Sequence, residues 1–222
     1  MNELLFILHS LLISIFAVIA LKISKEALIS FLCVQAILSN LFVSKQIILF
    51  GFCATCSDAF SVGSSLSLNL LQEYFGKQIA QKTIWISFFC LIFYLLMTQM
   101  HLIYIPSEFD IMQKNFYEIF QFAPRIVIAS LIAYLISQQI DLRLYNFFKK
   151  KFEGKYFILR NYGSLLISQF VDTLIFTFLG LYSIVENPLQ IFTISYFVKV
   201  FTIILAAPIV GILKKILENK LF

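Results

Sequence analysis

Charge is what this sequence has least of. Only 13% of its 222 residues are Asp, Glu, Lys or Arg, whereas 60% are hydrophobic, and the mean hydropathy is +0.91. Water-soluble domains typically carry about 25% charged residues. The composition therefore excludes an ordinary soluble domain and predicts an integral membrane protein.

Residues that support metal and redox chemistry are also scarce. The two histidines, His9 and His101, lie far apart, and the pair Cys53 and Cys56 has metal-ligand spacing without a second Cys pair or a nearby His. The sequence also lacks a glycine-rich phosphate-binding loop. We therefore predict no metal, no cofactor and no ATP hydrolysis by this chain, and we expect that it is not an enzyme.

Long apolar windows come next, and a bilayer takes about 20 helical residues to cross. Six windows cover residues 4–21, 27–44, 84–105, 121–141, 162–183 and 191–213. A seventh segment, 53–73, is diluted by serines and is either a polar-faced spanning helix or a broken, re-entrant one. Because residues 1–3 lack Lys and Arg and no small-residue cleavage site follows, we expect the first window to remain as a helix. We predict an all-α, polytopic transmembrane bundle of six or seven helices, with residues 1–222 forming a single domain.

Basic residues gather in four alternate connections, which the positive-inside rule assigns to the cytoplasm. These connections hold Lys22 and Lys25; Lys77 and Lys82; Arg143, Lys149, Lys150, Lys151, Lys155 and Arg160; and Lys214, Lys215 and Lys220. Seven crossings, with the N-terminus outside and the C-terminus cytoplasmic, fit this alternation. The net charge of +5 is then explained by topology and by anionic lipids. We therefore expect the lipid bilayer as a partner and no nucleic acid.

The carboxylate Asp172 lies near the middle of the apolar run 162–182. An ionisable group at the centre of a membrane helix costs about 2.5–3.5 kcal/mol, so it usually faces a cavity, an opposite charge or a ligand. Two cations, Arg125 and Lys199, also lie in apolar windows. If the last two helices are antiparallel neighbours, Lys199 lies within about 5 Å of the depth of Asp172. A structural salt bridge and a role in substrate or proton coupling both remain open.

Three helices carry polar or small residues at spacings of three or four, which places each set on one helix face. The sets are Ser65, Asn69, Gln72 and Gly76; Ala129, Ala133, Ser137 and Asp141; and Ser164, Ser168 and Asp172. Close helix packing explains the small residues, whereas Asp172, Gln138 and the stretch 69–73 favour a lined cavity. The string Ser137–Asp141 is repeated in form by Ser168–Asp172, which hints that the two helices bring similar groups to one cavity.

An ordered set of short motifs runs from about Lys45 to Pro208. The set comprises Phe50-Gly51, Glu73-Tyr74-Phe75-Gly76-Lys77, Arg125 to Ser130 with Ala133-Tyr134, Ser137 to Asp141, Gln169 to Thr173 with Phe176, and Tyr196 with Lys199. Together these motifs resemble the queuosine precursor transporter family, also described as a vitamin uptake transporter family. The resemblance implies uptake of 7-deazaguanine bases, queuine or its precursors, across the bacterial cytoplasmic (inner) membrane for tRNA modification. One position departs from the family: Asn69 stands where an Asp is usual, so an acidic role is not expected there.

Such a base would suit the polar groups of these helices. A guanine-like edge offers adjacent N–H donors to a carboxylate and a carbonyl to an amide. We expect Asp172 to accept from the donors, Gln169 and Gln138 to read the carbonyl, and a midplane site to work by alternating access. The rings of Tyr134 and Phe176 would stack on the base. The predicted substrate-binding residues are Asp172, Gln169, Gln138, Asn69, Glu73, Tyr134, Phe176, Arg125 and Lys199.

Other functions stay open at this level. Substrate-binding membrane subunits that need a separate ATPase module are similarly small and lack nucleotide motifs, and a homodimer is also compatible with the sequence. An intramembrane enzyme could use Asp172 as an acid or base, but no second catalytic group lies close in the pattern. A structural assembly factor is the remaining alternative.

Overall fold

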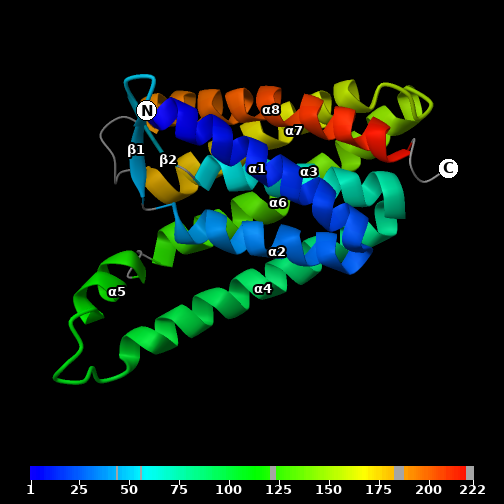
Figure 1. Ribbon diagram of the computed structural model, residues 1–222. Helices are drawn as coiled ribbons and strands as arrows, with labels where there is room; N and C mark the ends of the chain where they lie inside the picture. Colours follow the sequence, from blue (N-terminus) through cyan, green and yellow to red (C-terminus); the bar gives the residue numbers. More distant parts are fainter. Residues whose placement is uncertain (44, 56, 121–123, 183–187, 219–222) are drawn as a thin grey trace.

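The computed structural model is a bundle of helices with a small β-hairpin at one end (Figure 1). It describes residues 1–43, 45–55, 57–120, 124–182 and 188–218, and at positions 53, 124–127, 181, 207 and 209–218 it describes the backbone alone. The α-helices are α1 (Asn2–Ile23), α2 (Lys25–Leu41), α3 (Ser57–Phe75), α4 (Lys77–Ile103), α5 (Gln113–Phe120), α6 (Pro124–Lys151), α7 (Phe157–Phe176) and α8 (Pro188–Glu218). A π-helical turn, η1 (Thr177–Leu181), continues α7. The predicted all-α fold class is confirmed.

Four of the described helices are long and apolar enough to cross a membrane. They are Asn2–Ile23, Lys77–Ile103, Phe157–Gly180 and Pro188–Ala206. The protein is a multi-pass membrane protein, as predicted. Helices α2 (Lys25–Leu41) and α6 (Pro124–Lys151) cover most of the predicted windows 27–44 and 121–141, but they are not among these four. Both helices bury polar side chains against their neighbours, and such groups are tolerated in a membrane when other helices enclose them.

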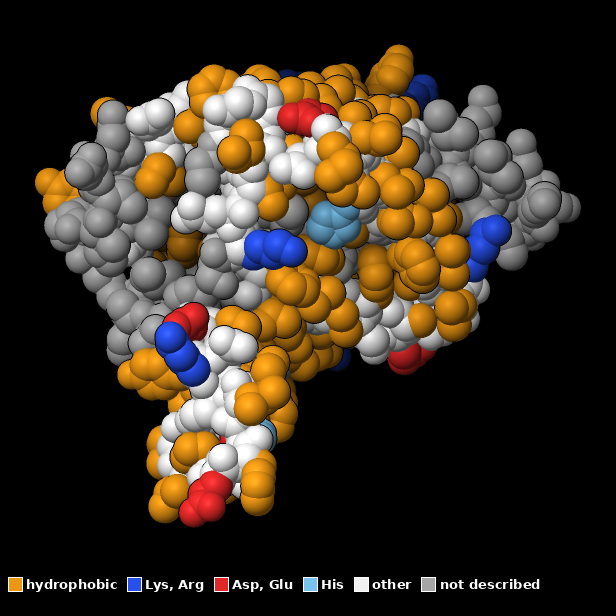
Figure 2. Space-filling model, turned by 60° about the vertical axis from the view of Figure 1, so that its left-hand side comes forward, with side chains coloured by type: hydrophobic (Ala, Val, Ile, Leu, Met, Phe, Trp, Pro, Cys, Tyr) orange, Lys and Arg blue, Asp and Glu red, His pale blue; other side chains and the backbone are white. Residues whose placement is uncertain are grey.

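The outer surface of the bundle is apolar, as expected for a surface in contact with lipid. On α4, the large side chains of Trp85, Phe89, Phe93 and Leu96 are between 53% and 69% exposed. Hydrophobic side chains cover much of the described face in Figure 2, with few charged groups among them. A soluble protein rarely exposes so continuous an apolar surface. The surface therefore agrees with the membrane assignment from composition.

Helix α3 is the centre of the bundle. The polar segment 53–73, whose path the sequence left open, is a continuous helix from Ser57 onward, and 14 of its 19 residues are buried. It packs against α1, α2, α4, α6, α7 and α8. Its serines and Asn69 therefore face protein on nearly every side, which explains why the helix can be polar without being broken or re-entrant.

Short connections hold neighbouring helices side by side. Ser24 separates α1 from α2, and its side chain accepts a hydrogen bond from the Ala27 N–H, as an N-cap does. Gly76 alone separates α3 from α4 with φ of +85°, a conformation that glycine adopts without steric penalty. Helices joined so tightly run in opposite directions, as Figure 1 shows.

The β-hairpin was not predicted from the sequence. Strand β1 (Gln46–Leu49) pairs antiparallel with β2 (Phe52–Thr55), and the two-residue turn Phe50-Gly51 has positive φ at both positions. The hairpin is anchored to α1, because Asn2 donates to the Ile48 carbonyl and Glu3 accepts from the Phe50 N–H. Strands of four residues inside an apolar run are too short to show a period of two, which is why the pattern missed them.

The two ends of the bundle differ in charge. We call the end that holds the β-hairpin the hairpin end, and the end that holds Gly76 and the 152–156 connection the basic end. Figure 1 shows that α1, α3, α6 and α8 all run from the hairpin end towards the basic end. The predicted basic connections after α1, α3 and α6 therefore lie together at one end, as alternate crossings require.

Candidate substrate-binding site

A polar pocket of about 70 Å³ lies in the hairpin half of the bundle, between α2, α3, α6, α7 and α8. Thr55 of strand β2 also lines the pocket. Its polar and aromatic lining residues are Ser39, Asn40, Thr55, Ser57, Asp58, Ser61, Ser130, Tyr134, Asp172, Thr173, Phe176, Ser195 and Lys199. A concave site with a few converging polar groups between helices is where small molecules usually bind.

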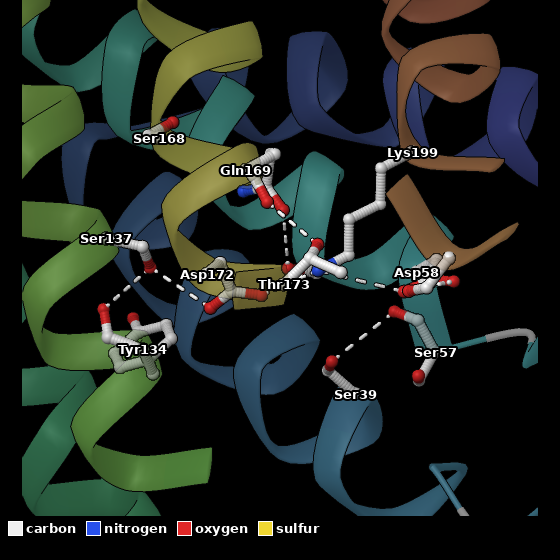
Figure 3. Close-up of polar contacts among 12 residues, drawn as sticks. Ser39, Ser57, Asp58, Tyr134, Ser137, Ser168, Gln169, Asp172, Thr173 and Lys199 are labelled. Carbon is white, nitrogen blue, oxygen red and sulfur yellow. Dashed lines mark hydrogen bonds and ion pairs between the residues drawn. The ribbon is translucent and has the colours of Figure 1, made fainter. Parts of the chain in front are cut away.

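Two carboxylates share one lysine in this pocket. The Lys199 Nζ lies 2.6 Å from Asp172 Oδ2 and 3.8 Å from Asp58 Oδ1, and Figure 3 shows the ammonium group between the two acids. The ion pair between Asp172 and Lys199 that helix depth predicted is present. Ser195 Oγ donates to the Asp58 carboxylate, 3.2 Å from either oxygen. With all three groups ionised the cluster carries a net charge of −1, so it attracts a ligand that donates hydrogen bonds.

Asp58 was missed at the sequence level as a site residue. It stands in the first turn of α3 and its side chain is only 6% exposed. The available signal was a second carboxylate in a segment bound for the membrane, but the serine-rich surroundings made it resemble a helix end near water. Only the packing of α3 against α8 shows that Asp58 faces Lys199.

Tyr134 and Phe176, the two rings predicted to stack on a base, both line the pocket beside Asp172. The Tyr134 hydroxyl shares a hydrogen bond with Ser87 Oγ of α4 at 2.6 Å. Phe176 is the last residue of α7 before the π-helical turn η1. Such turns are rare and occur often at functional sites. The aromatic wall is thus fixed by a hydrogen bond on one side and by an irregular helix end on the other.

Gln138 and Gln169 form a layer next to the pocket. Gln138 Nε2 lies 3.2 Å from both Ser64 Oγ and Ser65 Oγ, and Gln169 Nε2 donates to Ser65 Oγ at 3.0 Å. The other end of Gln169 accepts from Ser61 Oγ, which does line the pocket. The two amides therefore both bond to serines of α3 in the layer next to the pocket. Neither glutamine lines the pocket itself, where the prediction placed them as readers of the carbonyl.

The repeated string on α6 and α7 forms reciprocal contacts. Ser137 Oγ donates to Asp172 Oδ1 at 3.2 Å, and Ser168 Oγ donates to Asp141 Oδ1 at 3.4 Å. Each serine thus donates to the carboxylate of the other helix. In both helices the serine precedes the aspartate by four residues, and because the helices are antiparallel the serine of one lies beside the aspartate of the other. The repeated string therefore places two carboxylates at two depths, and only Asp172 lines the pocket.

Asn69 and Glu73 lie farther along α3, about 17 Å and 22 Å beyond Asp58 by helix rise. Asn69 Nδ2 donates to Ser164 Oγ at 3.1 Å. The Glu73 carboxylate accepts two hydrogen bonds of 3.1 Å from Arg160, and it lies 2.8 Å from Lys149 Nζ. Neither residue lines the pocket. Glu73 instead forms an ion pair near the basic end of the bundle with Arg160, whose side chain is fully buried.

Arg125, the remaining predicted site residue, has a side chain outside the part of the chain that the structure describes. The other eight residues fall into three groups. Asp172, Lys199, Tyr134 and Phe176 line the pocket, Gln138 and Gln169 form the next layer, and Asn69 and Glu73 continue towards the basic end. The predicted set therefore follows a polar line through the bundle and extends well beyond one binding site.

Comparison with known proteins agrees with a transport role. Residues 59–213 match the family model described as "Putative vitamin uptake transporter". The chain is also 32% identical over 199 residues to a protein of Bacillus subtilis (strain 168) named "Probable queuosine precursor transporter", covering 88% of this chain and 86% of that protein. No solved structure matches the chain.

Proposed function

Because the chain belongs to the vitamin uptake transporter family, we propose that it imports a queuosine precursor, a 7-deazaguanine base such as queuine, by alternating access. The observation that carries this proposal is the polar pocket lined by the cluster of Asp172, Lys199 and Asp58 and by the rings of Tyr134 and Phe176. The name of the Bacillus subtilis relative supports the substrate class.

The pocket offers the groups that a guanine-like base needs. Either carboxylate accepts hydrogen bonds from adjacent N–H groups of the base, and the Lys199 ammonium donates to its carbonyl. Tyr134 and Phe176 supply ring faces for a flat heterocycle. When the base binds, it takes over part of the interaction that Lys199 now makes with Asp172, so that little charge is left without a partner.

Alternating access gives the deeper residues a role. In the proposed orientation the hairpin end faces outward, so the pocket receives the base from outside while the basic end is closed by Glu73 and Arg160. Opening towards the cytoplasm separates that ion pair and brings the base past Gln138 and Gln169. Glu73 is then a gate residue instead of a substrate ligand, and Gln138 and Gln169 bind the base at an intermediate depth.

Transport by the purified protein tests this proposal. Liposomes that contain only this protein should take up labelled queuine or its precursors and should ignore labelled uracil. Asp172→Ala should abolish uptake while the protein remains in the membrane, because Lys199 keeps Asp58 as its counter-ion at 3.8 Å. Glu118→Gln is a matched control, because Glu118 is 57% exposed on α5 and lies outside the pocket. Tight binding without transport would instead favour a substrate-binding subunit that needs a separate ATPase. A changed product in the absence of transport would favour an enzyme.

A further inference from the structure

Four carboxylates lie inside the helix bundle: Asp58, Glu73, Asp141 and Asp172. Three of them have a Lys or Arg nitrogen within 4 Å. Asp141 has no such partner among the described residues, although its side chain is fully buried. A buried carboxylate without a compensating charge is strongly unfavourable, so Asp141 needs a proton or another cation when it is enclosed.

The surroundings of Asp141 are polar but neutral. Ser168 Oγ donates to Asp141 Oδ1, and the Ser164 and Asn69 side chains face the same carboxylate. Asp141 Oδ2 and Asn69 Oδ1 are both buried without a hydrogen-bond partner in the described structure. An unpartnered carboxylate oxygen in a buried site indicates that the site holds something that the protein itself does not supply.

Charged and titratable groups on the packed helices do not fill this role. On α3 the next acid is Glu73, and on α7 the next cation is Arg160, but these two pair with each other. On α6 the cation Arg143 lies two residues from Asp141, but its side chain is exposed and makes no ion pair with Asp141 in the described structure. Tyr145, four residues from Asp141 on the same helix, donates its hydroxyl to Glu73 at 3.0 Å. The α4 helix, which also packs on α6, brings the Ser87 hydroxyl to the pocket-side residue Tyr134.

The pairing of α6 with α7 allows Asp141 to be compared directly with Asp172. Asp172 and Asp141 occupy matching places in the repeated string and each accepts from the serine of the other helix. Asp172 is balanced by Lys199, a permanent part of the protein. Along α7, Ser168 lies four residues from Asp172, so the two carboxylates differ in depth by about 6 Å. Any movement of α6 against α7 alters both sites together.

We propose that Asp141 is the proton-binding site that couples uptake of the base to a proton gradient. The carboxylate takes one proton from the outer side, by way of the pocket, before the bundle encloses it. The neutral acid releases that proton to the cytoplasm when the basic end opens and water reaches Asp141. The Gln72 side-chain amide and the Asn161 side-chain oxygen Oδ1 are also buried without a hydrogen-bond partner in the described structure. They lie beside Glu73 and Arg160 in sequence and mark the exit side. This inference rests on the proposed transport function for its consequence, but the proton site can be tested by itself.

Infrared difference spectra of the purified protein test proton binding without any substrate. Between acid and alkaline buffer, the wild-type protein should show a protonated carboxyl band that Asp141→Asn removes and Glu118→Gln keeps. Ser168→Ala, which removes one donor to the carboxylate, should retain the band and move its pH midpoint upwards, because the charged form loses a hydrogen bond. An unchanged band in Asp141→Asn overturns the proposal, whether or not the protein transports.

Liposome transport tests the coupling. With labelled queuine, a pH gradient of one unit should drive about tenfold accumulation if one proton accompanies each neutral base, since one pH unit is a tenfold ratio. Asp141→Asn should lose this accumulation yet keep exchange of labelled for unlabelled base, within about twofold of wild type. Accumulation by Asp141→Asn equal to wild type, or accumulation that follows a Na⁺ gradient alone, overturns the proposal. If the wild-type protein moves no base but its carboxyl band depends on Asp141, the proton site stands and the proposed function falls.

Discussion

Replacing Lys199 by methionine is the sharpest perturbation of the pocket. The side chain keeps its length and loses its charge, while Asp172 Oδ2 and Asp58 Oδ1 lose the ammonium group that lies 2.6 Å and 3.8 Å away. All three side chains are at most 15% exposed. These groups have little contact with water, so water in the pocket can replace the missing cation only in part.

The expected effect is large because two buried carboxylates are left facing each other. Removing one partner of a buried ion pair typically costs about 3–5 kcal/mol, and the free energy of unfolding of Lys199→Met should fall by about that amount. The triple variant Lys199→Met, Asp58→Asn, Asp172→Asn carries no charge here and should regain at least half of the loss, since neutral replacement of a buried ion pair is often tolerated.

The free energy of unfolding of both variants is measured by reversible unfolding in mixed detergent micelles. Their uptake of labelled queuine is measured in liposomes. Both variants should lack uptake, because each lacks the Lys199 donor to the base carbonyl and the triple variant also lacks the two carboxylates that accept from the base. Lys114→Met is the matched control, since Lys114 is 86% exposed and 3.9 Å from Glu118, and it should change neither property. If Lys199→Met unfolds within about 1 kcal/mol of wild type, the lysine does not hold the two acids as described and the proposed pocket chemistry is wrong.

Three further predictions concern other parts of the bundle. Gly63→Ala should lower the free energy of unfolding by about 1–3 kcal/mol, because the added methyl group meets Gln35 Oε1 in the centre of the bundle; stability equal to wild type would show that this contact relaxes freely. Tyr134→Phe should bind labelled queuine almost as well as wild type, whereas Tyr134→Ala should bind at least tenfold more weakly in an equilibrium titration, since the ring and not the hydroxyl stacks on the base; equal weakening in both would assign recognition to the hydroxyl. Glu73→Ala should lose about 3–5 kcal/mol of stability by leaving Arg160 buried without a carboxylate, yet keep binding within about twofold; a tenfold loss of binding at unchanged stability would make Glu73 a substrate ligand.

The match to the transporter family covers residues 59–213, which begins one residue after Asp58 and contains most of the pocket. Helices α1 and α2 precede that region, and α2 still contributes Ser39 and Asn40 to the pocket wall. Asn40 Oδ1 accepts a short hydrogen bond from Ser130 Oγ of α6. Helix α2 therefore completes the pocket, and substitutions of Ser39 and Asn40 are expected to alter substrate preference.

Composition and local apolar runs determined that this is a helical membrane protein. Lipid solvates each segment according to its own side chains, so a run of 20 apolar residues needs no neighbours to specify its state. The pairing of Asp172 with Lys199 was also predictable from the sequence, because helix rise and short connections set the depth of a residue from its position in the chain.

Tertiary structure alone decided what each polar face meets. The polarity of α3 suggested a weak or broken span, and only its enclosure by six other helices shows that it is the core. The same packing brings Asp58 to Lys199 and leaves Asp141 without a cation in the described bundle. Periodicity fixes the direction of a side chain from its helix axis, but the partner across the gap depends on how helices far apart in sequence are arranged.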